Sequence, residues 1–306
     1  WGLGIGTGLI LLVRIANPFI YDKETVESLT SIPIIGIIRE FPGFIDKDNT
    51  QALSVQKPKS IFAESVRSVR TNLSFLAGEK KSKVICITSE ISGEGKSFVS
   101  INLASTLALI DKKVILLAAD LRKSKLHKSF QTDNKKGLST YLSTQDEIES
   151  IIVKTSIDNL DFIPSGPVPP NPSELLHTRR MQEMIAELSK TYDFVLLDTA
   201  PVGLVSDSIP LIRHADINLF VIRSGVSRYN AATIPDRLSG EYKLSNVVIV
   251  LNAVTDDMFH SRYYSSNYTG GAYQYYYSDY SGYSGDGYYS EDEKPKWWNF
   301  YKRFKS

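Results

Sequence analysis

Short apolar runs alternate with longer amphipathic stretches through most of this chain. The runs hold few polar residues, so a strand in each would be buried on both faces, which is typical of a mainly parallel sheet covered by helices. We therefore predict an α/β fold with helices on both faces of the sheet. The predicted strands cover residues 84–88, 114–118, 160–163, 194–197, 218–222 and 247–251, and the predicted helices cover 61–76, 97–110, 172–190, 206–213 and 230–239.

The pattern is different at the amino-terminal end, where residues 1–13 are uncharged and there is no initiator Met. As a helix they would cover roughly 20 Å, less than a hydrocarbon core of about 30 Å. We interpret 1–16 as the end of a transmembrane helix, with Arg14 on the cytoplasmic side; a buried helix or an expression remnant is the alternative. Residues 17–60 are expected to be a juxtamembrane segment and linker, with a strand or a docking turn at 32–38.

The opposite end, 257–306, is rich in tyrosine. Eleven of the 17 tyrosines lie between residues 263 and 289, among Ser, Gly and Asp. Such a stretch buries too little apolar surface to offset the entropy of ordering it, so we expect a flexible tail. Its phenols are candidate phosphate acceptors, and a low-complexity tail without that role is the alternative. The candidates are Tyr263, Tyr264, Tyr268, Tyr273, Tyr275, Tyr276, Tyr277, Tyr280, Tyr283, Tyr288 and Tyr289.

The net charge and the cysteine content reduce the range of functions that the chain could have. The formal net charge of +1 gives no argument for nucleic-acid binding, so no nucleic-acid partner is expected. The single cysteine, Cys86, excludes an intrachain disulfide and fits a reducing compartment. Because it lies in an apolar run, we expect a core residue rather than a reactive thiol.

A glycine-containing loop joins the predicted strand 84–88 to the helix that follows. Gly93 and Gly95 permit a close backbone approach to phosphates, Lys96 would reach the β- and γ-phosphates, and the Ser97 hydroxyl would bind Mg²⁺. Glu90 stands where the first glycine of the G-x-x-x-x-G-K-[ST] pattern is usual, and a chance glycine-rich turn is the alternative. The expected nucleotide contacts of this loop are Gly93, Glu94, Gly95, Lys96, Ser97 and Phe98.

Carboxylates follow two further predicted strands. Asp198 follows four apolar residues, where a carboxylate beside a phosphate loop holds a Mg²⁺-bound water. Asp120 and Arg122 follow strand 114–118 and should face the same crevice, unless they only end the strand. Asn252 is a candidate adenine contact, and a strand-end cap is the alternative.

These segments, in this order, resemble the bacterial tyrosine kinases, which belong to the polysaccharide co-polymerases of capsule and exopolysaccharide export. Ala118-Ala119-Asp120-Leu121-Arg122 is similar to the family's second aspartate motif, and Asp198-Thr199-Ala200-Pro201 to its Walker B motif. Glu64, Arg67 and Arg70 match the E-x-x-R-x-x-R motif of contacts between kinase domains, although such a stripe could equally stabilise its own helix. The end of a transmembrane helix and the tyrosine-rich tail complete the resemblance.

The resemblance implies a P-loop NTPase-like tyrosine kinase domain at 61–256 that uses ATP and Mg²⁺ to phosphorylate the tails of neighbouring copies. It implies that Lys96, Asp120 and Asp198 are catalytic and that Arg122 contacts the nucleotide. The implied metal ligands are Ser97, Asp120 and Asp198. It implies a homo-oligomeric ring, an octamer in the family, in the bacterial inner membrane, with this portion cytoplasmic. The expected partners are a cognate tyrosine phosphatase and the polysaccharide export and polymerisation machinery.

The chain departs from the family at Ala118, where the first aspartate of the motif is usual. Alanine can neither accept a proton nor bind a metal, so we predict little or no kinase activity, with nucleotide binding largely retained. An engineered substitution and a naturally degenerate kinase both remain open. The alternatives are a non-catalytic ATP-binding assembly module for export and a partition-type ATPase, which needs an extra lysine where this chain has Ile91.

Overall fold

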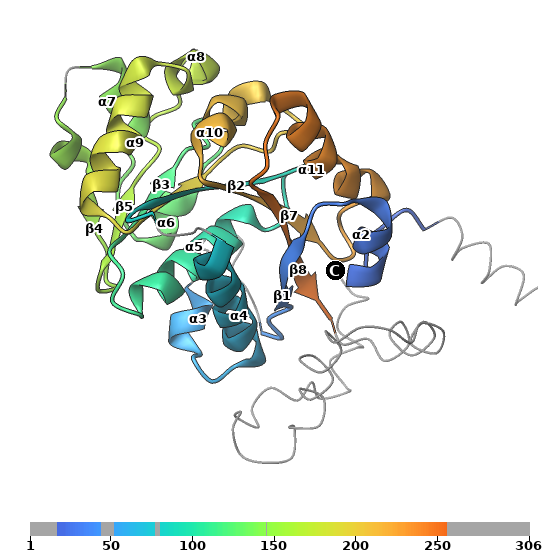
Figure 1. Cartoon of the computed structure of the whole chain (residues 1–306). Coiled ribbons are helices and arrows are strands. Elements are labelled where there is room, and N and C mark those ends of the chain that lie inside the picture. The colour runs from blue at the N-terminus through green and yellow to red at the C-terminus, as the bar shows by residue number, and fades with distance from the viewer. Residues whose placement is uncertain (1–16, 44–51, 77–79, 145, 256–306) are drawn as a thin grey trace, which may run out of the picture.

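The computed structural model describes residues 17–43, 52–76, 80–144 and 146–255. These form an eight-stranded sheet in the order β1-β8-β7-β2-β6-β3-β5-β4, in which every neighbouring pair is parallel except the antiparallel pair β4–β5 (Figure 1). The strands are β1 (Ile34–Arg39), β2 (Lys83–Ser89), β3 (Val114–Ala118), β4 (Val153–Lys154), β5 (Leu160–Ile163), β6 (Phe194–Asp198), β7 (Ile217–Arg223) and β8 (Val247–Val254).

Helices cover both faces of the sheet (Figure 1). One face carries α3 (Leu53–Gln56), α4 (Ile61–Leu76), α5 (Lys96–Ala108) and α6 (Leu126–Ser129). The other carries α2 (Lys23–Leu29), α7 (Leu138–Ser143), the 3₁₀ turn η1 (Ile148–Ile151), α8 (Pro172–Leu176), α9 (Arg179–Thr191), the 3₁₀ turn η2 (Ser206–Ser208), α10 (Ile209–His214) and α11 (Tyr229–Tyr242).

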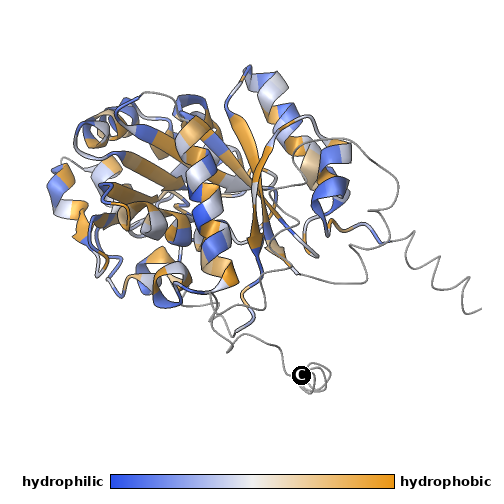
Figure 2. Cartoon of the chain, turned by 60° about the horizontal axis from the view of Figure 1, so that its bottom comes forward, coloured by the Kyte–Doolittle hydropathy of each residue, from blue (hydrophilic) through white to orange (hydrophobic). Residues whose placement is uncertain are grey.

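The two helical layers explain why the strand sequences do not alternate. All five residues of β3 are buried, with Leu116 facing the α4–α5 layer and Leu117 the opposite one. Figure 2 shows these strands as a hydrophobic band between more polar helices. The predicted α/β fold is therefore confirmed. Cys86 on β2 is fully buried, and burial raises the pKa of its thiol to about 12, as expected of a core residue.

The sheet extends further than the predicted strands. Residues 34–39 form β1, which pairs in parallel with β8, so the strand expected within 32–38 is confirmed and is an edge of the same sheet. β4 was not predicted, because two residues are too short to show a hydrophobic period.

Two predicted helices are divided in the structure. The predicted helix 172–190 is two helices, because Thr178 caps the start of α9 by accepting a hydrogen bond from the Met181 backbone N–H. The predicted helix 206–213 begins as the 3₁₀ turn η2 before it becomes α10. The predicted helix 61–76 is confirmed as α4, with Leu76 half exposed at its end.

The predictions for 1–16 and for the tail tyrosines lie outside the described residues. Among the helices that the structure does describe, none combines the length and the apolar character needed to span a bilayer.

Candidate nucleotide and metal site

The phosphate loop leaves the carboxyl end of β2 and leads into α5, with two glycines in the left-handed region. Gly93 has φ +94° and Gly95 has φ +90°. A Cβ on Gly93 would meet nothing within 4 Å, whereas one on Gly95 would lie 2.3 Å from Asn252 Nδ2. Gly93 is therefore needed for its backbone angles, and Gly95 for its angles and for space.

Side chains from the neighbouring strands hold this loop in place. Asn252 Nδ2 on β8 donates to the carbonyl of Glu94 at 3.0 Å, and Arg223 Nη1 at the end of β7 donates to the carbonyl of Gly93 at 2.9 Å. These carbonyls are thus occupied by the protein itself. Asn252 thus supports the loop through its Nδ2, and its predicted adenine contact stays a prediction.

The loop also contains a fully buried carboxylate, Glu94. Its Oε2 accepts a hydrogen bond from the Ile91 backbone at 2.8 Å, and its Oε1 accepts one from the Ser227 hydroxyl. The Glu94 side chain therefore shapes the loop, which leaves its backbone for the predicted phosphate contact. Similarly, the ring of Phe98 packs on Phe62, with the centroids 5.2 Å apart, so its side chain belongs to the core.

Asp198 lies directly behind the loop and is almost completely buried. Its Oδ2 accepts a hydrogen bond from Ser97 Oγ at 2.7 Å, and its Oδ1 accepts one from Ser100 Oγ at 2.9 Å. Burial raises the pKa of Asp198 to about 6, against the opposing effects of Lys96 and the two hydroxyls. Sequence reasoning missed Ser100, although it lies three residues after Ser97 and so shares its helix face.

Ala118 ends β3 in register with Asp198 on β6. Side chains of register partners in a parallel pair point to the same face of the sheet, so position 118 lies beside the Asp198 carboxylate on the α5 side. The backbone N–H of Asp120 donates a hydrogen bond to the Asp198 carbonyl at 3.0 Å, which places Asp120 next to Asp198 as well. Its Oδ1 accepts hydrogen bonds from the backbones of Arg122 and Lys123, at 3.1 and 3.0 Å.

Arg122 contacts a carboxylate that the sequence did not single out. Its Nε and Nη2 donate to the two carboxylate oxygens of Asp207 at 2.5 and 3.1 Å, a bidentate pair. The Asp207 side chain is only 3% exposed. Arg122 is thereby bonded to η2, and its contact with a nucleotide stays a prediction.

The side-chain oxygen ligands at this site suit Mg²⁺ that is bound together with a nucleotide. A hydroxyl and a carboxylate, from Ser97 and Asp198, are hard oxygen ligands of the kind that Mg²⁺ takes beside phosphates and water. Within the described ranges, no group of three or more His, Cys, Asp or Glu side chains could hold a metal by itself. The ion would therefore depend on phosphate oxygens for part of its coordination.

The predicted contact motif on α4 forms bonds within its own domain. Arg67 Nη2 pairs with Glu64 Oε2 at 2.6 Å, and its Nη1 donates to the carbonyl of Pro58 at 2.9 Å. Arg70 Nη1 donates to the carbonyl of Thr106 on α5 at 2.9 Å. A role of these side chains in a ring stays a prediction.

Comparison with known proteins gives consistent matches. The family described as "AAA domain" matches residues 82–226. The tyrosine-protein kinase wzc of Salmonella typhi is 36% identical over 219 residues, which is 70% of this chain and 30% of that protein. The tyrosine-protein kinase YwqD of Bacillus subtilis is 39% identical over 173 residues, covering 56% of this chain and 73% of YwqD.

A solved structure agrees with these sequence matches. The kinase domain of the Escherichia coli tyrosine kinase ETK superposes with a TM-score of 0.70 at 31% identity, covering 82% of this chain and 99% of that domain. The chain therefore matches a complete kinase domain, although it spans only about a third of the length of relatives such as wzc.

Proposed function

Because the chain belongs to the bacterial tyrosine-protein kinases, we propose that it is an ATP-dependent protein-tyrosine autokinase domain whose acceptors are the tail tyrosines of neighbouring copies. The observation that carries this proposal is the contact of Ser97 with the buried Asp198 directly behind the phosphate loop. A hydroxyl and a carboxylate in that arrangement are the protein ligands of a nucleotide-bound Mg²⁺.

Each residue of the site has a defined task in this proposal. The backbone N–H groups of 93–97 and the start of α5 bind phosphate oxygens, and Lys96 offsets their charge. Ser97 and Asp198 would hold Mg²⁺, and the ion would supply positive charge beside the phosphates. Since a tyrosine phenol has a pKa of about 10, a carboxylate that accepts its proton would assist the transfer. Asp120 and an aspartate at position 118 are the candidates.

Ala118 removes one of those carboxylates. We propose that the chain as written binds Mg·ATP but transfers little phosphate. The second candidate function, a non-catalytic ATP-binding assembly module for polysaccharide export, is favoured by this same alanine. A partition-type ATPase has less support, because Ile91 stands where such proteins need a lysine.

The remaining parts of the proposal concern assembly and location. We propose a homo-oligomeric ring, an octamer by family resemblance, in which Glu64, Arg67 and Arg70 exchange their present bonds for contacts with a neighbour. The ring lies at the bacterial inner membrane with this portion in the cytoplasm. It acts with the polysaccharide export and polymerisation machinery and with a cognate tyrosine phosphatase.

Transfer of labelled phosphate tests the proposed activity. The full chain carrying Ala118→Asp is incubated with Mg²⁺ and γ-³²P-labelled ATP, and label is expected in the tail. The same chain with Lys96→Met added is the control and should stay unlabelled. If Ala118→Asp binds Mg·ATP but its tyrosines remain unmodified, the kinase proposal is wrong and the assembly module takes its place.

A further inference from the structure

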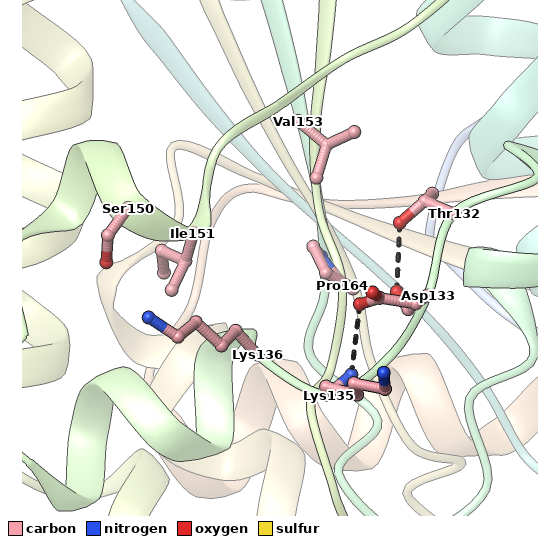
Figure 3. Close-up of a pocket in the computed structure, with 8 residues that line it drawn as sticks. All are labelled: Thr132, Asp133, Lys135, Lys136, Ser150, Ile151, Val153 and Pro164. Carbon is pink, nitrogen blue, oxygen red and sulfur yellow. Dashed lines mark hydrogen bonds between the residues drawn. The ribbon is translucent and has the colours of Figure 1, made fainter.

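A cavity of about 320 Å³ lies beyond the phosphate loop, where β5 ends (Figure 3). Its wall includes Lys135, Lys136, Ser150, Ile151 and Pro164. Figure 3 shows Lys136 extending toward Ser150 and Ile151. Because Pro164 directly follows β5, the cavity opens at the same carboxyl edge of the sheet as the nucleotide site.

The loop that carries the two lysines is held in one position. Asn134 forms a pair of hydrogen bonds with Gly166, from its Nδ2 to the carbonyl at 2.8 Å and to its Oδ1 from the backbone N–H at 2.9 Å. Leu138 N–H donates to the Pro164 carbonyl at 2.8 Å. Both lysines are exposed, and neither forms an ion pair with any residue that the structure describes. A fixed loop therefore presents two exposed cations beside a cavity whose wall also contains one carboxylate, Asp133.

These lysines end a strongly basic segment, 122–136. It holds one arginine and five lysines against a single aspartate, a net charge of +5 in a chain whose overall charge is +1. The segment begins beside Asp120, where Arg122 is paired with Asp207, and ends at the cavity, where Lys135 and Lys136 are exposed. A segment with this charge attracts and orients an acidic ligand.

The tail 257–306 is neutral overall, with six acidic and six basic residues, but one part of it carries the complementary charge. Residues 263–293 contain Asp279, Asp286, Glu291, Asp292 and Glu293 and no lysine or arginine, a net charge of −5. Three of these acids are consecutive, at 291–293, and directly precede Lys294. The acidic stretch 291–293 is therefore the densest negative charge that the tail offers.

The spacing relates this stretch to particular tyrosines. In the sheet, β5 lies next to β3 and β3 next to β6, so the cavity beyond β5 is roughly 10–15 Å from Asp198 at neighbouring-strand spacings of about 4.8 Å. An extended chain covers that distance in about three to four residues. A peptide anchored at Asp292 would therefore place Tyr288 or Tyr289 at the metal site, whereas Tyr263 would be far beyond it.

We propose that the basic segment 122–136 and its cavity form a docking site for the acidic stretch 291–293 of the tail, which selects Tyr288 and Tyr289 as the first phosphate acceptors. This inference rests on the proposed kinase function for its consequence, but the docking itself needs no catalysis. Contacts between exposed charges are weak. They suffice here because the proposed ring holds the tail of a neighbouring copy at an effective concentration in the millimolar range.

Binding of a tail peptide tests the docking directly. The probe is a fluorescent peptide of residues 284–293, measured by anisotropy against the full chain whose own tail carries Glu291→Gln, Asp292→Asn and Glu293→Gln. Lys135→Gln with Lys136→Gln should weaken binding about fivefold at low salt. The matched control is Lys112→Gln with Lys113→Gln, an exposed pair at the opposite edge, which should change it less than twofold. Equal effects of the two pairs, or no effect of either, would overturn the docking site.

Mapping of phosphotyrosine separates this proposal from the kinase proposal. In the Ala118→Asp chain, Tyr288 and Tyr289 should be modified first, and replacing Lys135 and Lys136 should remove that preference. Selective peptide binding without any phosphorylation would support docking and refute the kinase function. Phosphorylation without selective peptide binding would support the kinase function and refute docking.

Discussion

Replacing Ala118 by aspartate places a second buried carboxylate beside Asp198, and the cost of doing so can be worked from the sheet. The two positions are register partners on adjacent parallel strands, so the carboxylates would lie about 5 Å apart on the same face. Two charges at that distance repel by about 3 kcal/mol at an effective dielectric constant near 20. The free energy of unfolding of the nucleotide-free Ala118→Asp protein should therefore be at least about 3 kcal/mol lower than that of the parent at pH 7.5.

A metal ion between the two carboxylates would reverse this penalty. Saturating Mg·ADP should stabilise the parent by about 2.7 kcal/mol at 100 times its Kd. It should stabilise Ala118→Asp by up to about 3 kcal/mol more, because the repulsion is relieved in the complex. Urea unfolding with and without Mg·ADP measures both quantities.

Ala119→Asp provides the matched control. Ala119 is equally buried, but it packs in the cluster on the opposite face of the sheet. Its replacement should destabilise the protein without any additional gain from Mg·ADP. If Mg·ADP stabilises Ala118→Asp no more than it stabilises Ala119→Asp, position 118 does not face the metal and the reasoning is refuted.

Three further substitutions test other parts of the site. Burial raises the pKa of Asp198 to about 6, so its favourable contribution to folding is complete below the unfolded value near 4 and is lost as the pH rises through 6. Asp198→Asn should therefore gain stability over the nucleotide-free parent by up to about 3 kcal/mol between pH 4 and 7, and a difference that does not vary with pH would contradict this. Gly95→Ala should weaken Mg·ATP binding at least tenfold in a titration, since its Cβ would lie 2.3 Å from Asn252 Nδ2, and Gly93→Ala, which meets nothing within 4 Å, should weaken it less. Arg122→Ala leaves the buried carboxylate of Asp207 without its partner and should lower the free energy of unfolding in urea by about 2 kcal/mol. The loss is smaller than for a fully buried pair because Arg122 itself is 43% exposed. Adding Asp207→Asn should recover most of that loss.

The sequence predicted the fold and the phosphate loop because both are local patterns. Apolar runs without alternation are typical of strands buried on both faces, and β3 and β6 are buried throughout. The loop was recognisable because its strand, glycines, Lys96, Ser97 and helix are consecutive. These features need no knowledge of what packs against them.

The supporting contacts could not be predicted because they join distant parts of the chain. Ser227 and Glu94 are 133 residues apart, and Arg122 and Asp207 are 85 apart. Each polar residue by itself is equally compatible with an exposed loop. The predicted nucleotide contact of Arg122 illustrates the difficulty, since the fold brings a buried carboxylate to it that no local motif indicates.

The affinity of the full chain for Mg·ATP, compared with that of its Lys96→Met variant by titration calorimetry, tests the central claim most directly. Methionine keeps most of the length of this mostly buried side chain and removes only its charge. A charge-assisted contact to phosphate contributes about 1.5–3 kcal/mol, so the variant should bind at least tenfold more weakly. Equal affinity of the two proteins would show that the triphosphate does not lie on this loop.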